Sequence, residues 1–265
     1  MNRSWIDSVE EFQMLNYSSL NIIQEMLQKL SEKAPRTFTP DERKNLEIFG
    51  PLAEQLQDIQ EHTRPFENVP DAVYQLKITL YDSKPPIWRR IQVKNTITLA
   101  TLHNIIQIVM GWEDCHLYEF ERGKRPYIVT YRDHDPDEPF GDAGFNPEGN
   151  VYEVHLKEAL AEEKQKLTYL YDMGDAWEHV LLLEKILPVD DKAVHPICLK
   201  SKGACPPEDF GGIWAYREFL EALPDKKHSG HQYAKEQLKE WFGGDFNPDD
   251  TDIEDINQQL KQINQ

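Results

Sequence analysis

Two runs of alternating apolar and polar residues constrain the fold of this chain more than any other feature. The first run occupies residues 74–80 and the second residues 87–93, with Pro85 and Pro86 between them. Alternation with a period of two is typical of a half-buried strand. The pair therefore predicts an antiparallel hairpin, and one face of that hairpin needs cover from other elements.

The elements expected after the hairpin are typical of an α+β protein. A helix is expected over residues 98–110, because apolar residues recur there at spacings of three and four and Gly111 follows as a stop. We expect further strands near residues 117–122, 126–131, 166–171 and 177–187, and helices near residues 155–163, 213–223, 229–242 and after a capping box at Thr251 and Glu254. The predicted sheet is mixed and mostly antiparallel, with helices at the C-terminal end. The opening order of hairpin, helix and strand is β-grasp-like.

The front of the chain forms a separate segment, with a helical extension over residues 1–66 and the α+β domain over residues 72–265. Amphipathic spacing predicts one helix over residues 7–33 and a second over residues 39–62. Pro65 and Pro70 then indicate a linker. We expect residues 7–62 to engage a protein partner or a second copy of the chain.

Charge and cysteine content exclude several classes of function. The formal net charge is −18, and no run of lysine and arginine is present to neutralise phosphates. Direct nucleic-acid binding is therefore not expected, least of all unaided binding of a duplex, and neither is an anionic membrane surface. The first residues contain no signal peptide, and no stretch has the roughly 20 apolar residues of a membrane span. Three cysteines fit a reducing compartment, so we expect a cytoplasmic protein.

Several motifs built from uncommon residues follow one another over residues 72–260. They are residues 85–90 (PPIWRR), 111–112 (GW), 116–117 (HL), 171–179 (YDMGDAWEH), 203–209 (GACPPED) and 245–248 (DFNP). In this order they resemble the Ri-plasmid ORF-three-like domain family. That resemblance implies an uncharacterised protein, and some members carry a mobile-element or transposase label. Met173 and Ala176 stand where the family often has phenylalanine and glycine, and Phe210 stands where it often has a cysteine.

The densest polar group lies in residues 171–179. A turn can bring Asp172 and Asp175 together, and on the following strand Trp177 and His179 share one face. A second segment supplies Glu208 and Asp209. One interpretation is a divalent metal held by Asp172, Asp175, His179 and Glu208, or an acid–base pair. The other is structural: the aspartates bind turn amides, His179 donates to a buried carbonyl, and Asp209 caps a helix.

Other candidate ligands are more scattered. Cys198 and Cys205, together with His195, resemble a zinc knuckle, although the spacing matches no established pattern. His116 follows an acidic turn and is a further candidate.

A tryptophan and two arginines in the second strand form another candidate group. Trp88 and Arg90 should share one face of that strand, with Arg89 on the other. They form either a structural stack or a wall that holds an anionic ligand.

Two hypotheses of function follow from these features. The first is a binding or regulatory module, mobile-element-associated if the family label applies, that uses its front helices for association. The alternative is a metal-dependent hydrolase for a small phosphate- or nucleotide-like substrate, with the anion held by Arg89 or Arg90. Catalytic residues are not assigned, and a divalent metal is the one cofactor that the residues suggest.

Overall fold

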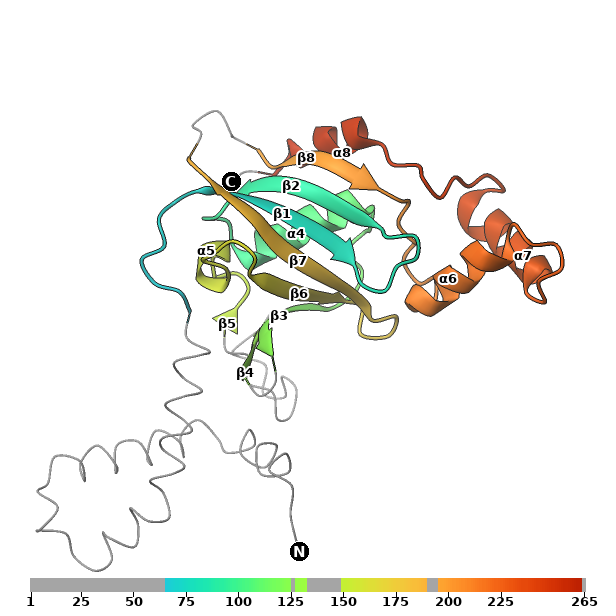
Figure 1. The fold of residues 1–265 in the computed structure, drawn as a ribbon, viewed down its shortest axis with the longest axis horizontal. Helices are drawn as coiled ribbons and strands as arrows, with labels where there is room; N and C mark the ends of the chain where they lie inside the picture. Colours follow the sequence, from blue (N-terminus) through green and yellow to red (C-terminus); the bar gives the residue numbers. More distant parts are fainter. Residues whose placement is uncertain (1–64, 125–126, 133–148, 190–194, 264–265) are drawn as a thin grey trace, which may run out of the picture. The chain divides into compact units, whose positions relative to one another are not determined.

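The fold centres on one mostly antiparallel sheet, seen in a computed structural model that describes residues 65–124, 127–132, 149–189 and 195–263 (Figure 1). Its eight strands lie in the order β5-β4-β3-β6-β7-β1-β2-β8. Their bounds are Val73–Leu80 (β1), Trp88–Lys94 (β2), Tyr118–Lys124 (β3), Tyr127–Arg132 (β4), Gly149–Asn150 (β5), Lys166–Tyr171 (β6), Trp177–Leu187 (β7) and Ile197–Lys202 (β8). The short β5 pairs in parallel with β4. The α+β class expected from the sequence is confirmed.

Strands β1 and β2 form the expected hairpin, with Leu76 opposite Ile91 on the buried face. Strand β1 also pairs in antiparallel fashion with β7, and a β-bulge interrupts that pairing between Gln75 and Leu76. Strands β6 and β7 lie between β3 and β1 in the sheet. The β-grasp likeness therefore stays an interpretation of element order.

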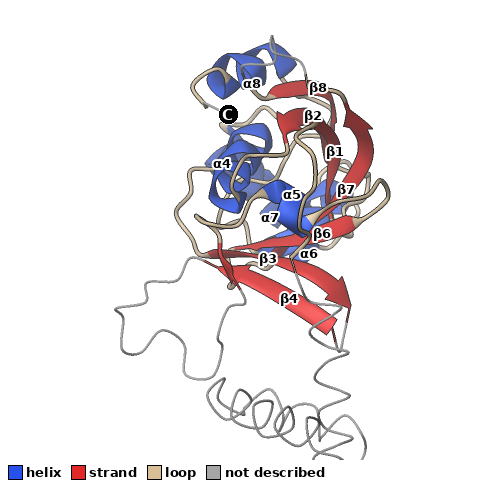
Figure 2. Ribbon diagram, turned by 90° about the vertical axis from the view of Figure 1, so that its left-hand side faces the viewer, coloured by secondary structure: helices blue, strands red, loops and turns tan. Residues whose placement is uncertain are grey.

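Helix α4 (Leu99–Met110) covers the apolar face of these strands, and α5 (Leu156–Ala159) and α8 (Ile253–Leu260) lie on the same side (Figure 2). Thr98 caps α4 by accepting the Thr101 amide, and Gly111 ends it in the left-handed conformation, as the sequence predicts. Buried residues from both layers, such as Leu102, Ile105 and Leu76, form one core. This core fixes the strand ends that carry the polar loops.

Helices α6 (Gly212–Ala222) and α7 (His231–Phe242) follow the loop after β8. The cap of α8 differs from the prediction by one residue. Asp252 accepts the amide of Asp255, while the Thr251 hydroxyl pairs with Ser201. Within the described residues, no helix combines the length and the apolar character that crossing a membrane requires.

Some predictions of secondary structure need correction, and others stay open. Strands β5 and β8 are not among the predicted elements. The helix predicted near residues 155–163 is a single turn, since Leu160 already has extended backbone angles. The two helices expected before residue 63, and the extension of residues 1–66 up to residue 64, lie outside the described residues.

Candidate functional site

A loop after α4 presents the first part of the site, and nearly all its amides are bound. The amide of Asp114 donates to the Gln107 side chain at 3.0 Å, and that of Cys115 donates to the Tyr171 hydroxyl at 2.9 Å. The Glu113 amide donates to the Glu208 carboxylate at 2.9 Å. Residues 113–116 are thus held by three other segments of the chain.

A buried histidine of α4 contacts the same loop from the protein interior. His103 lies 2.7 Å from the Asp114 carboxylate through Nε2 and 2.7 Å from the Tyr169 hydroxyl through Nδ1. Its ring stacks on Tyr118, with the centroids 3.6 Å apart. Burial lowers the pKa of His103, and the neighbouring Asp114 carboxylate opposes that effect. Asp114 itself has a φ of 58°, a conformation that these contacts support.

The turn between β6 and β7 presents the second part. Asp172 is buried, has a φ of 56°, and accepts the Gly174 amide at 2.8 Å. Asp175 accepts the Gly211 amide at 2.9 Å. Asp172 binds an amide of its own turn, as the structural interpretation predicted, whereas Asp175 binds an amide of another segment. Asp175 also joins this turn to the loop before α6.

That loop, residues 206–211, presents the third part. Its Pro206 carbonyl accepts the Trp112 indole N–H at 2.9 Å. Glu208 accepts a short hydrogen bond from the Tyr171 hydroxyl. Burial, followed by the nearby Glu208 carboxylate, raises the pKa of Tyr171. The following residue, Asp209, has a φ of 57° and an exposed side chain.

One ring nitrogen and two carboxylates converge where these three segments meet. His116 Nε2 lies 3.1 Å from Asp209 Oδ1 and 3.8 Å from Asp172 Oδ2, and one ligand atom from each residue lies within 4.8 Å of the others. Ligands about 2.1 Å from one ion lie about 3.0 Å apart at right angles and about 3.4 Å apart at tetrahedral angles. The Nε2 atom is shielded from solvent and makes no hydrogen bond of acceptable geometry. The group needs only a small contraction to hold a cation.

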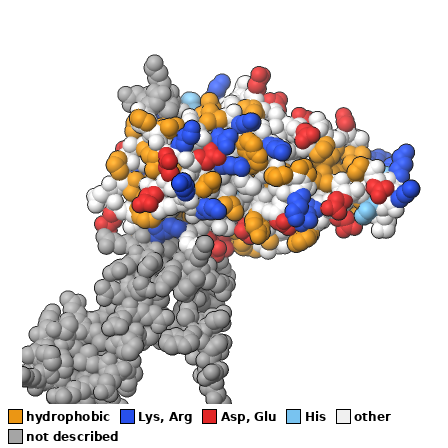
Figure 3. Space-filling model, viewed as in Figure 1, with side chains coloured by type: hydrophobic (Ala, Val, Ile, Leu, Met, Phe, Trp, Pro, Cys, Tyr) orange, Lys and Arg blue, Asp and Glu red, His pale blue; other side chains and the backbone are white. Residues whose placement is uncertain are grey.

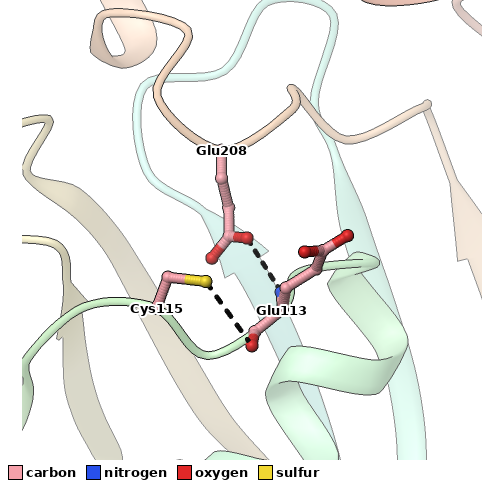
Figure 4. Close-up of side chains that lie close together, drawn as sticks. All are labelled: Glu113, Cys115 and Glu208. Atoms are coloured by element: carbon pink, nitrogen blue, oxygen red, sulfur yellow. Dashed lines mark hydrogen bonds between the residues drawn. The ribbon is translucent and has the colours of Figure 1, made fainter.

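A second group adjoins the first along the chain. Glu113, Cys115 and Glu208 offer two carboxylates and a thiol within 4.8 Å of one another (Figure 4). Desolvation, followed by the carboxylates of Glu208 and Glu113, raises the pKa of the Cys115 thiol. The surroundings of His116 are therefore strongly acidic, and this favours a cationic ligand.

The structure brings together some of the predicted residues and separates others. Asp172, Glu208, Asp209 and His116 lie in this cluster, and Asp175 lies at its edge. His179 and Trp177 are fully buried behind it. His179 Nδ1 lies 3.0 Å from the Trp177 carbonyl, and burial lowers the pKa of His179 to about 4. The geometry therefore does not support one ion held by Asp172, Asp175, His179 and Glu208.

The arginines lie away from the cluster. Arg89 is buried, and its guanidinium donates to the carbonyls of Val109, Lys202 and Gly203 at 2.7, 3.2 and 3.0 Å. Because Val109 is in the last turn of α4, Arg89 also binds the negative end of that helix. Arg90 makes a bidentate pair with Glu184 at 2.6 and 2.8 Å, on the opposite face of the sheet.

The cysteines of the proposed knuckle are separated as well. Cys198 is buried on β8 beside Asn257, and Cys205 Sγ contacts Arg89 and Met110, each at 3.2 Å. His195 lies 3.1 Å from the Ile263 carbonyl. Within the described residues, Cys198, Cys205 and His195 are absent from both groups of clustered ligand atoms.

Two contributors to the loop cluster were missed by sequence reasoning. Glu113 and Tyr171 lie next to motif residues, yet the role of each depends on a contact with Glu208. For Glu113, that partner lies about a hundred positions further along the chain. The only local signal was the acidic turn before His116.

Together, the fold and site define an α+β protein in which an acidic, preorganised loop cluster lies at one end of strands β3, β6 and β7. The family model of the plasmid pRiA4b ORF-3-like protein matches residues 72–255, and the chain belongs to this family. The resemblance inferred from the motifs is thereby confirmed.

Two relatives show how far the likeness extends. The uncharacterized protein y4hQ of Sinorhizobium fredii (strain NBRC 101917 / NGR234) is 38% identical over 173 residues, which cover 65% of this chain and 81% of that protein. A crystal structure of the protein of unknown function MM3350 from Methanosarcina mazei Go1 is similar with a TM-score of 0.58 and 37% identity. The similarity covers 70% of this chain and 97% of that one. Both relatives are described as uncharacterised or of unknown function.

Proposed function

We propose that this chain is a cytoplasmic binding or regulatory module whose loop cluster is organised by one divalent cation. The supporting observation is the convergence of His116 Nε2, Asp172 and Asp209 within 4.8 Å. One imidazole and two carboxylates suit ions such as Mn²⁺ and Zn²⁺. The cation would join the loop after α4, the β6–β7 turn and the loop before α6, because each supplies one ligand.

The backbone conformation of the loops adds support for a bound cation. Three aspartates of these loops, Asp114, Asp172 and Asp209, have a φ between 56° and 58°. Such conformations cost about 1–3 kcal/mol each and cluster at functional sites. Two negative ligands would neutralise the ion, and the second group of Glu113, Cys115 and Glu208 would keep the surroundings negative.

Titration of Mn²⁺ or Zn²⁺ into the full-length protein, followed by calorimetry, tests this proposal. Asp172→Asn is the informative variant because an asparagine oxygen can still accept the Gly174 amide while the charge is lost. We expect at least about a tenfold loss of affinity and a smaller rise in Tm with added metal. Asp249→Asn, at an exposed aspartate outside the cluster, is the matched control. Equal affinities in the two variants, or no binding by the native protein, would refute the metal site.

Association through the front helices is a separate part of the proposal. Residues 7–62 carry two amphipathic patterns, so Leu20→Asp and Leu27→Asp should disrupt any interface they form. Light scattering of the full-length double variant should then give a lower mass than the native chain. An unchanged mass, with no loss of partner capture, would exclude this mode of association. A mobile-element role has no support from the two relatives, since neither description mentions one.

Hydrolysis at the same cation is the second candidate function. The observation in its favour is that three protein ligands leave coordination positions open for water and substrate. Two observations argue against a phosphate-like substrate. Arg89 and Arg90 are engaged elsewhere, and the side chains around the cluster are acidic. Turnover of a phosphate ester by the Mn²⁺-loaded protein, absent in Asp172→Asn, would establish this alternative.

A further inference from the structure

The solvent-facing side of the central strands is basic, although the chain as a whole carries a formal charge of −18. On β6, β7, β1, β2 and β8, this side carries two glutamates, Glu178 and Glu184, against a larger set of cations. These are Lys77, Arg90, Lys94, Lys166, Lys185, Lys200 and Lys202. In Figure 3, lysine and arginine side chains gather over these strands. We call this surface the basic face.

Strand register places several of these cations in one line. Lys166 lies opposite Leu182, which lies opposite Lys77; Lys77 lies opposite Arg90, and Arg90 opposite Lys200. With strands about 4.8 Å apart, this row is about 19 Å long. Like charges directly opposite each other destabilise a sheet. Among the described residues, Glu184 pairs with Arg90 and also lies in the field of Lys77, so one carboxylate faces four cations of the row and the excess charge favours an anionic ligand.

An aromatic side chain lies beside this row. Trp88 occupies the next cross-strand row, between Thr79 and Lys202, and is partly exposed. The Lys77 ammonium lies 5.1 Å from its ring centroid and the Arg90 guanidinium 5.2 Å. Tryptophan beside cations on an open sheet is the arrangement with which several β-sheet domains stack bases and bind phosphates.

A shallow hollow completes the face next to the β-bulge. It measures about 450 Å³, and its lining includes Arg90, Lys164, Lys185, Leu182 and Glu184. Arg90 stays paired with Glu184, so Lys164, Lys185 and the leucine are the groups that can accept a phosphate together with an apolar ring. The helices α4, α5 and α8 lie on the other side of the sheet and leave these strands open (Figure 2).

From these observations we infer that the basic face binds single-stranded nucleic acid. The row of cations matches a chain of phosphates, while Trp88 and the hollow can take up bases. A sheet of several strands is too broad for the grooves of a duplex, which admit a helix or a two-stranded ribbon. The expectation of no nucleic-acid binding rests on the net charge of the whole chain. At physiological salt, charges further away than the Debye length of about 8 Å act weakly on this face.

Fluorescence anisotropy with labelled 20-nucleotide oligo-dU and oligo-U tests this inference on the full-length protein. In the triple variant Lys77→Gln, Lys200→Gln, Lys202→Gln, affinity at 100 mM salt should fall at least about tenfold. The slope of log affinity against log salt should become shallower by about 2, since each lost phosphate contact removes about 0.7. Lys226→Gln, Lys227→Gln, Lys235→Gln is the matched control, with the same change of charge on or next to α7. Comparison of oligo-dU with oligo-U, which differ in the sugar alone, shows which sugar is preferred.

Substitutions of the tryptophan separate base stacking from charge. Trp88→Leu should weaken binding about tenfold with an unchanged salt slope, and Trp88→Phe should retain most of the affinity. Asp172→Asn should bind like the native chain, because the basic face does not depend on the cation site. Thermal melting of each variant verifies that it is folded.

Four outcomes would overturn the inference: no oligonucleotide binding, an equal loss in the α7 control, equal competition by poly-glutamate, or capture by phosphatidylserine vesicles in place of the oligonucleotide. The third result would identify an acidic protein as the occupant, and the fourth a membrane.

Discussion

The loop cluster and the basic face use charge in opposite ways. In the cluster, His116, Asp172 and Asp209 come from three loops whose backbone is fixed by amide hydrogen bonds and positive φ values. On the basic face, side chains follow from strand alternation alone, and like charges lie directly opposite. Each loop of the cluster thus has a fixed local conformation and the packing of three loops brings the ligands together, whereas the face is specified by the register of paired strands.

Arg89 and Arg90 are adjacent on β2 and compare a buried cation with one on the basic face, and Arg89 should give the largest effect. Arg89→Met removes the donor for two buried carbonyls and one partly buried carbonyl, so we expect the free energy of unfolding to fall by about 4 kcal/mol. Arg90→Met loses a partly exposed pair with Glu184 and should cost about 1 kcal/mol or less. Urea denaturation of both variants provides the measurement. Similar losses would show that the two faces do not differ in the way described.

The contact between the β6–β7 turn and the loop before α6 gives the next largest effect. Gly212 has a φ of +78°, and an added Cβ would lie 2.6 Å from the Asp175 carbonyl oxygen. Gly212→Ala should therefore cost about 3 kcal/mol and lower the Tm, because the backbone of one loop must move. Gly243→Ala, with a φ of +65° and nothing within 4 Å, isolates the conformational cost of about 1 kcal/mol. If the two variants have the same Tm, the two loops are not in tight contact.

The sequence predicted the regular elements well and the site only in part. Period-two alternation and caps such as Thr98 are local, so β1, β2, β6, β7 and α4 could be placed from composition and spacing. The motifs also indicated that Asp172, Glu208 and Asp209 carry polar roles. The third ligand of the cluster, His116, was one candidate among several, since its distance to Asp172 depends on the packing of three loops.

Two errors have the same physical origin. Strand β8 could not be placed from local sequence because its pairing with β2 is a long-range contact. The net charge of the whole chain likewise gives no sign of the basic face. Lys77, Arg90 and Lys200 are distant in sequence and form a row only through the register of β1, β2 and β8.

The buried His179 behind the loop cluster predicts a pH dependence of stability. Its pKa is about 4 in the folded chain because of burial, against about 6.5 when exposed. The unfolded chain therefore binds more protons between these values, so stability is complete above pH 6.5 and is lost as the pH falls towards 4. This one group should cost about 2.5 kcal/mol at pH 4.5.

Replacement of the ring isolates that contribution from other titrating groups. His179→Phe fills a similar volume and cannot be protonated, so the difference in unfolding free energy between native and variant should narrow or reverse as the pH falls from 7 to 4.5. His103 is retained in both proteins and cancels. A difference that does not change with pH would mean that His179 is already protonated or reaches water.

The smallest effect concerns the basic face and has the opposite sign. Lys200 lies directly opposite Arg90, so Lys200→Gln removes a repulsion and should raise the unfolding free energy by about 0.3 kcal/mol at low salt. The gain should disappear at 0.5 M salt, where the charges are screened. Lys226→Gln, remote from the sheet, should show no such gain. If Lys200→Gln instead destabilises the chain, the lysine contributes to folding, and the row of cations no longer requires a ligand to explain it. If it stabilises the chain and also weakens oligonucleotide binding, stability and binding oppose each other at this one residue, as expected for a functional surface.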